Sequence, residues 1–348
     1  MSGTNGPVTI DGSIGEGGGQ VVRTACALSS ITGVPCRVFN IRKDRTKTGL
    51  RVQHLAGLRA LAALCEGRLE GGNVGSEEIY FTPAAIKPKT LNVEIETAGS
   101  ITLVLQTVLL PSFFAPGPVN VVFRGGATDT SFSPTIDYHR FVFLKLLKRV
   151  GLSSTVEVLR RGFYPKGGAV LKAGALPGRP KSWSCTERGS ISGISIISGA
   201  SESLKKARVG ERQAEAAEKV LTEQLDLPCV KQVDYAHARS PGSHITIVAA
   251  SRNTVLGADG LGERGKRAEM VGEEAAQKLL KEIRLGACLD VHAADQLLPY
   301  LALAEGSSTV AVSGVSEHTK TNIFVIKQFL NRDFQVTQTD LGAIITVV

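Results

Sequence analysis

The order of apolar segments in this chain recurs three times, and this recurrence restricts the fold more than any other feature. Each copy is predicted as a helix, a strand, a loop, a second helix and two strands, with glycine or proline between elements. The copies share little identity, so the order of the elements carries the interpretation. Two helices on one face of a small sheet would bury the apolar side of each copy, which predicts layered α+β repeats.

The predicted elements follow from apolar periodicity and glycine stops. The first helices are predicted at 20–32, 101–114 and 294–304, and the strands after them begin near 37, 119 and 309. The second helices are predicted at 52–64, 136–150 and 321–330. The closing strands are predicted at 79–81 and 91–95, at 155–159 and 169–172, and at 334–337 and 343–347.

The interval between the second and third copies is longer than the first interval by roughly a hundred residues. Within it, strand-like segments at 191–197 and 244–250 alternate with helical segments near 211–225 and 267–283 that mix both charge signs, as solvated faces do. We therefore predict a large domain of residues 1–184 and 287–348. A small inserted domain is predicted at residues 185–286.

Charge favours a polyanionic partner. The 348 residues hold 40 Lys and Arg against 32 Asp and Glu, and seven of the basic residues lie between Arg37 and Arg59 with a single acid. Such a loop suits nucleic acid or nucleotide phosphate, although a solvated surface gives the same pattern. A second basic stretch, Arg140 to Lys166, alternates with apolar positions and favours a surface helix. Aromatic residues are only 5%, which argues against a broad stacking platform for single-stranded nucleic acid.

Several classes of protein are disfavoured. No apolar run approaches the ~18–20 residues that span a bilayer, and the first residues lack a signal-peptide pattern, so we expect a cytoplasmic protein with no membrane partner. The six cysteines are scattered without a CxxC pair, which argues against structural zinc and a disulfide scaffold. We expect them to be small core residues.

A glycine-rich segment, residues 15–24, precedes a predicted helix. Glycine lets the backbone approach a ligand, and a helix N-terminus attracts anions. The spacing matches neither standard phosphate loop. Glu16 among these glycines suits a divalent cation beside phosphate, and the alternative is a solvated residue in a surface turn.

Isolated polar residues elsewhere suggest contacts with a ligand. His318 is predicted in a strand-to-helix loop, where imidazole can act as base, ligand or nucleophile, although a single loop histidine often has no such role. Gln106 in an apolar helix is either a ligand contact or a satisfied core amide. Gln53 and His54 end the basic loop and can supply directional hydrogen bonds.

The segment DVHAADQ, residues 290–296, is predicted at another strand-to-helix junction. Its His292, Asp295 and Gln296 could bind ribose hydroxyls or an adenine edge. Asp295 could equally be only a helix cap.

Four segments together resemble the RNA 3′-terminal phosphate cyclase family. They are DGSIGEGGGQVVRT, IRKDRTKTGLRVQHL, TAGSITLVLQTVLLP, and HAADQLLP paired with SEHTKTNI. The resemblance covers nearly the whole chain, and the ordered combination is specific. It implies three units of two helices on a four-stranded sheet, similar to the C-terminal domain of bacterial initiation factor three, with an inserted small domain of thioredoxin-like topology.

The resemblance implies an enzyme that converts an RNA 3′-terminal phosphate into a 2′,3′-cyclic phosphodiester, using ATP and a divalent metal, Mg²⁺ or Mn²⁺. A histidine would attack the α-phosphorus of ATP and become AMP-linked, releasing pyrophosphate. AMP would pass to the RNA 3′-phosphate, and the vicinal 2′-hydroxyl would then displace it. The expected partner is RNA with a 3′-phosphate end. The oligomeric state stays open, with a homodimer as one expectation.

Matched position by position, the resemblance also implies roles for single residues. His318 occupies the adenylated position, and Glu16 the acidic position near metal and phosphates. ATP contacts are implied for Gln106, Pro134, His292, Ala293, Ala294, Asp295 and Gln296. RNA or phosphate contacts are implied for Arg23, Arg42, Arg45, Gln53 and His54. His292 departs from the pattern, because related bacterial enzymes have a tyrosine against the base, although a histidine ring can still stack.

The sequence leaves two alternative functions to compare with the cyclase. A cyclase-like factor that binds RNA in ribosomal RNA processing without adenylation would lack the catalytic histidine, so His318 within SEHTKTN favours an enzyme. Fold analogy suggests the enolpyruvyl-transferase group, but the motifs here differ from theirs, and fold alone does not give function.

Overall fold

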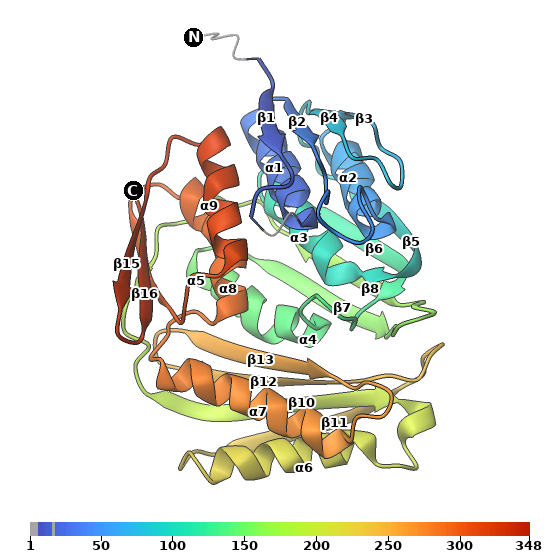
Figure 1. The fold of residues 1–348 in the computed structure, drawn as a ribbon, viewed down its shortest axis with the longest axis vertical. Coiled ribbons are helices and arrows are strands. Elements are labelled where there is room, and N and C mark those ends of the chain that lie inside the picture. Colours follow the sequence, from blue (N-terminus) through green and yellow to red (C-terminus); the bar gives the residue numbers. More distant parts are fainter. Residues whose placement is uncertain (1–5, 16–17) are drawn as a thin grey trace.

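The computed structural model describes residues 6–15 and 18–348, and its described strands assemble into four-stranded sheets (Figure 1). The first sheet and its helices comprise β1 (Val8–Asp11), α1 (Gly19–Thr32), β2 (Cys36–Phe39), α2 (Val52–Leu64), β3 (Arg68–Glu70) and β4 (Ile79–Thr82). Strand order in this sheet is β1-β2-β4-β3.

Two further sheets repeat this arrangement. One comprises β5 (Thr90–Ser100), α3 (Ile101–Ser112), β6 (Val119–Ala127), α4 (Ile136–Tyr138), η1 (His139–Phe143), α5 (Leu144–Arg149), β7 (Ser154–Arg160) and β8 (Val170–Ala175). The other comprises β9 (Ser184–Cys185), α8 (Val291–Leu303), β14 (Ser308–Val312), α9 (Glu317–Phe329), β15 (Phe334–Thr339) and β16 (Gly342–Val347).

All three sheets share one strand order. It is β1-β2-β4-β3, then β5-β6-β8-β7, then β9-β14-β16-β15. In each sheet the first pair is parallel and the other pairs are antiparallel. The predicted order of elements therefore recurs in the structure, with one further strand at the start of each copy.

The fourth sheet, of order β11-β10-β12-β13, lies at the opposite end of the molecule from the first (Figure 1). It contains β10 (Ile191–Ser201), β11 (Cys229–Ala236), β12 (Ser243–Ser251) and β13 (Val255–Leu261). The helices beside it are η2 (Glu202–Leu204), α6 (Val209–Thr222) and α7 (Ala268–Arg284). Its core draws only on residues 191–283, and its domain boundaries stay a prediction.

Local sequence explains how these elements begin and end. Strand β5 alternates exposed and buried residues over most of its length, as a sheet with one solvated face requires. At its end the Ser100 hydroxyl accepts a hydrogen bond from the backbone N–H of Leu103 at 3.3 Å and caps α3. Helix α1 ends at Gly33, whose φ of 73° is the left-handed conformation that glycine adopts without strain.

The structure corrects several predicted elements. The strand predicted at 91–95 is β5, which opens the second sheet instead of closing the first. The strand in its place is the three-residue β3, too short and polar to give a periodic signal. The single helix predicted at 136–150 has a π-helical middle, His139–Phe143.

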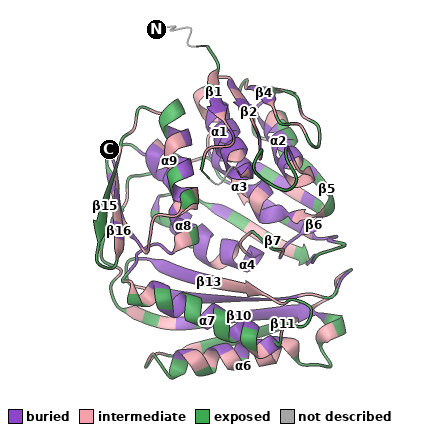
Figure 2. Cartoon of the chain, in the orientation of Figure 1, coloured by how far each residue is buried: buried purple, intermediate pink, exposed green. Residues whose placement is uncertain are grey.

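The helices of the first three units pack against one another, and α1 contacts α2, α3 and α9 (Figure 1). Their contact faces are buried, whereas α6 and α7 keep one face in solvent (Figure 2). Five of the six cysteines are buried and none forms a disulfide, as expected for core residues. Among the described residues, no helix combines the length and apolarity that crossing a bilayer requires.

Candidate active site

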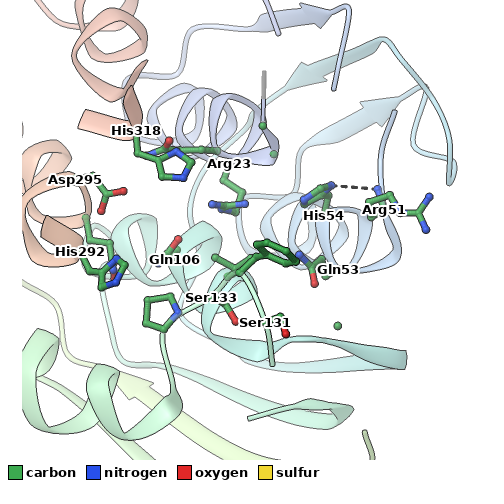
Figure 3. A pocket seen from close by; sticks show the side chains of 18 of the residues that line it. Arg23, Arg51, Gln53, His54, Gln106, Ser131, Ser133, His292, Asp295 and His318 are labelled. Atoms are coloured by element: carbon green, nitrogen blue, oxygen red, sulfur yellow. Dashed lines mark hydrogen bonds between the residues drawn. The ribbon is translucent and has the colours of Figure 1, made fainter. Parts of the chain in front are cut away.

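A cleft of about 1330 Å³ lies where the first turns of α1, α2, α3, α8 and α9 converge (Figure 3). Residues from those first turns line it: Gly19, Gln20, Val52, Gln53, His54, Leu103, His292 and His318. Each helix N-terminus carries a partial positive charge, so converging N-termini favour an anion.

Four arginines line this cleft: Arg23, Arg42, Arg45 and Arg51. Burial lowers the pKa of Arg23 to about 10, while the charge of Asp295 opposes that shift. Burial also lowers the pKa of Arg42, and the charges of Arg45 and Arg51 lower it further. Cations held this close repel one another, so a phosphate between them would relieve the repulsion.

His54 is a neutral hydrogen-bond donor in the wall of the cleft. Its Nδ1 accepts the backbone N–H of Arg51 at 3.1 Å, which places the ring proton on Nε2. Burial lowers its pKa to about 3, and the charges of Arg23, Arg42 and Arg51 contribute. A Cβ on Gly19 would lie 2.1 Å from Nε2, so the His54 ring reaches the start of α1 only because this residue is glycine.

Gln53 connects two helix starts. Its Oε1 accepts the backbone N–H of Ser100 at 2.8 Å, which holds the first turn of α2 against the first turn of α3. Gln106, in the second turn of α3, is half-buried and lines the centre of the cleft (Figure 3).

The other end of the cleft is built by α8. Asp290 is the helix cap, since its side chain accepts the backbone N–H groups of His292 and Ala293, and the hydroxyl of Tyr138 donates to it at 2.5 Å. The alternative that Asp295 is the cap is therefore wrong, because Asp295 lies a full turn inside the helix. The His292 ring meets Tyr138 edge-to-face at 5.9 Å, which orients the imidazole.

Asp295 faces the cleft with an unsatisfied oxygen. Its Oδ1 is buried and has no hydrogen-bond partner among the described residues. Burial raises the pKa of Asp295 to about 7, although His292 and Arg23 oppose this shift. At neutral pH this carboxyl can either accept or donate a hydrogen bond, which suits a ligand hydroxyl. Gln296 beside it also lines the cleft, whereas Ala293 and Ala294 lie in the core behind it.

His318 lies in the first turn of α9, not in the preceding loop as predicted, because Ser316 caps the helix two residues earlier. One turn further along the same face, Asn322 accepts the Thr24 hydroxyl at 2.8 Å and donates to the Asp295 carbonyl oxygen at 2.7 Å. This residue, which sequence reasoning missed, joins α9 to α1 and α8. It thereby fixes His318 relative to Arg23 and Asp295.

Pro134 belongs to a loop held at both sides. Its carbonyl oxygen accepts the Thr102 hydroxyl at 3.0 Å. The next residue, Thr135, donates its N–H to Asp259 at 2.7 Å and shares a hydroxyl hydrogen bond with Thr246. The loop is therefore clamped between α3 and the fourth sheet, and the cleft includes Asp259 in its wall.

Not every residue of the basic loop reaches the cleft. Arg37 pairs with Glu78 at 2.6 Å, and Arg59 donates to the Gly72 carbonyl oxygen. Neither lines the site. Glu16, the predicted metal ligand, lies outside the described residues. Within residues 6–15 and 18–348, no three His, Cys, Asp or Glu side chains gather as a metal site.

Comparison with known proteins points to one family. The profile of the family described as RNA 3′-terminal phosphate cyclase matches residues 14–336. A protein of that name from Ignicoccus hospitalis is 44% identical, covering 93% of this chain and 92% of its own. The one from Methanopyrus kandleri is 42% identical and covers 93% of both chains. A solved structure of EPSP synthase from Acinetobacter baumannii aligns with 98% of this chain and 82% of its own, at 12% identity and a TM-score of 0.31. This similarity is too weak to indicate a shared fold.

Proposed function

This chain belongs to the RNA 3′-terminal phosphate cyclase family, and from that premise we propose that it closes RNA 3′-phosphate ends into 2′,3′-cyclic phosphodiesters at the expense of ATP. Membership makes it an enzyme, and the intermediates are our proposal. One observation carries the proposal furthest. His318 lies in the first turn of α9, in a cleft that also contains converging helix N-termini and four arginines.

The proposed chemistry begins on His318. An imidazole nitrogen attacks the α-phosphorus of ATP, a nitrogen–phosphorus bond forms, and the bond to pyrophosphate breaks. An oxygen of the RNA 3′-phosphate then takes the AMP group from the histidine, giving an RNA-(3′)pp(5′)A end. Finally the 2′-hydroxyl loses its proton and attacks the 3′-phosphorus, and AMP leaves. Activation is needed because a 2′-hydroxyl cannot expel oxide from a phosphate monoester.

The two ends of the cleft suit the two substrates. For ATP, we assign His292 and Pro134 to the base, Asp295 and Gln296 to ribose hydroxyls, and Gln106 to the centre, supported by their places in the lining of the cleft. For RNA, we assign Arg42, Arg45, Gln53 and His54 to the end that also contains Arg51. Arg23 lies between them (Figure 3) and would stabilise charge on phosphoryl oxygens in both transfers.

The residues of the cleft are compatible with a divalent metal ion held largely by substrate phosphates. Mg²⁺ is usually held by one or two carboxylates together with substrate phosphates, so the lack of a three-ligand cluster in the described part of the chain is compatible with it. We propose that Glu16 supplies a carboxylate. The metal would neutralise charge on the phosphate oxygens.

Further proposals concern the folds of the four units and the location of the protein in the cell. We propose that each of the first three units is similar to the C-terminal domain of initiation factor three, supported by their common strand order. We propose a thioredoxin-like topology for the fourth sheet, supported by its parallel β10–β11 pair and antiparallel β12 and β13. A cytoplasmic location is proposed from the sequence alone, and the oligomeric state stays open.

A conversion assay tests the proposed function. RNA carrying a 3′-phosphate is incubated with the protein, with and without ATP, and the end is scored for resistance to phosphatase. We expect resistant ends only with ATP and Mg²⁺ or Mn²⁺, with AMP and pyrophosphate formed in equal amounts. Resistance that is independent of ATP, or a 3′-phosphate left intact, would contradict the proposal.

Salt dependence tests the role of the arginines. We expect RNA affinity to fall linearly on a log–log plot of salt, by roughly 0.7 per phosphate contacted. Replacing Arg42 or Arg45 with glutamine should reduce the slope by about one contact. Replacing Arg37, which pairs with Glu78 outside the cleft, should leave the slope unchanged. Equal slopes for all three variants would remove the arginines of the cleft from RNA binding.

A further inference from the structure

The rim of the cleft carries an exposed aromatic residue in an unfavourable backbone conformation. Phe132 is 101% exposed and has a φ of 63°, in the left-handed region that non-glycine residues with bulky side chains rarely adopt. It lines the cleft between Ser131 and Ser133, both of which extend toward the cleft in Figure 3. Neither apolar burial nor backbone preference accounts for this placement.

The surrounding structure holds the strained loop in place. Before it, Asp129 is buried and ion-paired with Arg161 at 3.0 Å. After it, Thr135 is tied to Asp259, as described above. Within it, the Ser133 hydroxyl donates to the Thr130 carbonyl oxygen at 2.9 Å. A strained residue that its surroundings fix so firmly is typical of a functional site.

A second exposed aromatic residue lines the same cleft. Tyr164, in the turn between β7 and β8, is 73% exposed. The arginines Arg42, Arg45 and Arg51 line this cleft too, so aromatic rings and guanidinium groups occur together. Aromatic rings beside a cationic track are the usual means of binding single-stranded nucleic acid.

The position of the loop indicates which base Phe132 meets. In Figure 3, Ser131 and Gln53 lie toward one end of the cleft and His292 toward the other. The adenine of ATP is assigned to the His292 end. A small ligand is normally enclosed by its site, whereas the end of a polymer must enter from a rim, where a fully exposed ring lies.

We propose that Phe132 stacks on the 3′-terminal nucleobase of the RNA, and that Tyr164 supplies a second stacking surface in the same cleft. This inference rests on the proposed function, because it takes an RNA end as the substrate. Stacking is tolerant of sequence, since every base has a π-face. The enzyme would therefore accept any terminal nucleotide, yet it would require a base to be present there.

The test compares variants that separate the ring from the backbone. Phe132→Asn keeps a residue that tolerates the left-handed conformation but removes the ring, and Phe132→Tyr keeps the ring. Val230→Ala, at an exposed position of β11 that does not line the cleft, is the control. Affinity is measured by fluorescence anisotropy with a 3′-phosphate RNA whose terminal nucleotide is normal or abasic. Self-adenylation is measured with ATP alone.

We expect Phe132→Asn to bind normal RNA roughly 5- to 150-fold more weakly, with self-adenylation unchanged. The wild-type chain should lose about as much affinity for abasic RNA, and the Asn variant should lose none beyond that. Phe132→Tyr and Val230→Ala should bind normally. Equal affinity of wild type and Phe132→Asn for normal RNA would overturn the inference, as would slowed self-adenylation in that variant.

Failure of the proposed function has a different signature. A wild-type chain that never becomes adenylated would overturn the proposed chemistry. The affinity difference between normal and abasic RNA would still decide whether Phe132 stacks on the terminal base.

Discussion

We expect the His318→Ala variant to take up no label from α-³²P-ATP and to close RNA ends at least roughly a thousandfold more slowly than the wild-type chain, because loss of a covalent nucleophile removes the whole pathway. His318 lies in the first turn of α9, where neighbouring N–H groups and Arg23 favour the phosphates of a nucleotide. In the described part of the chain, the other histidines that line the cleft are His54, which is buried, and His292, which is exposed.

A matched control separates loss of the nucleophile from disturbance of the helix. Lys320, two residues further along α9, is exposed and pairs with Glu317 at 2.6 Å. The Lys320→Ala variant should keep full labelling, and both variants should unfold at the same temperature as wild type. Label that survives in His318→Ala, or disappears in Lys320→Ala, would contradict the assignment.

The second large effect concerns stability. The Arg161→Met variant should lose about 3–5 kcal/mol of unfolding free energy at pH 7, because it leaves two buried carboxylates without their cation. Arg161 is 8% exposed and binds Asp129 at 3.0 Å and Asp137 at 2.5 Å. These aspartates flank the loop that carries Phe132 and Pro134, so the variant should also raise the KM for both substrates. Urea denaturation at two pH values measures the loss.

The stability that Asp137 contributes, and its loss in Arg161→Met, should depend on pH in a definite direction. Burial acts to raise the pKa of Asp137, but Arg161 and His244 outweigh it and the pKa falls below its ordinary value. A carboxylate with a lowered folded-state pKa stabilises the fold above its unfolded pKa, near 4, and loses that contribution as the pH falls through the folded value. Without Arg161, burial raises the pKa of Asp137, so the variant takes up protons at a higher pH than wild type. The penalty in Arg161→Met should therefore shrink as the pH falls from 7 to about 4 and below.

A neighbouring arginine provides the control. Arg160 is exposed and donates to the Gly168 carbonyl oxygen at 2.7 Å. The Arg160→Met variant should lose about 1 kcal/mol or less, with no dependence on pH between 4 and 7. Equal losses in the two variants would show that the buried ion pairs add nothing beyond a hydrogen bond.

Local sequence predicts those parts of the fold that depend on local periodicity. Long amphipathic or apolar helices such as α1, α2 and α3 fall within a few residues of their expected bounds. Among the missed strands, β1, β3 and β9 are two to four residues long, so their pairing with distant strands, not their own pattern, creates them. Strands β11 and β13 of the fourth sheet, of eight and seven residues, were missed as well. Most of β11 is exposed and β13 contains two glycines, so neither gives a clear apolar pattern. The π-helical turn at His139–Phe143 likewise depends on packing.

The sequence likewise indicates only part of the candidate site. Gln106, His292, Asp295 and His318, to which the resemblance assigns roles, all line the cleft, and those roles stay predictions. The residues that hold them in place were missed, since Asn322, Asp290 and Arg161 act through contacts across long sequence separations. No pattern of neighbours in the sequence signals such contacts. The low aromatic content argues against a broad platform, and it did not indicate the exposed rings of Phe132 and Tyr164 in the cleft.

The most direct test of the account is to locate the adduct. The protein is incubated with ATP and Mg²⁺ without RNA, digested at neutral pH, and its peptides are mapped by mass spectrometry. We expect AMP on the imidazole of His318, lost on acid treatment because the nitrogen–phosphorus bond of a histidine phosphoramidate is acid-labile. An acid-stable adduct, AMP on Lys320, or a chain that carries no AMP while closing RNA ends would contradict it.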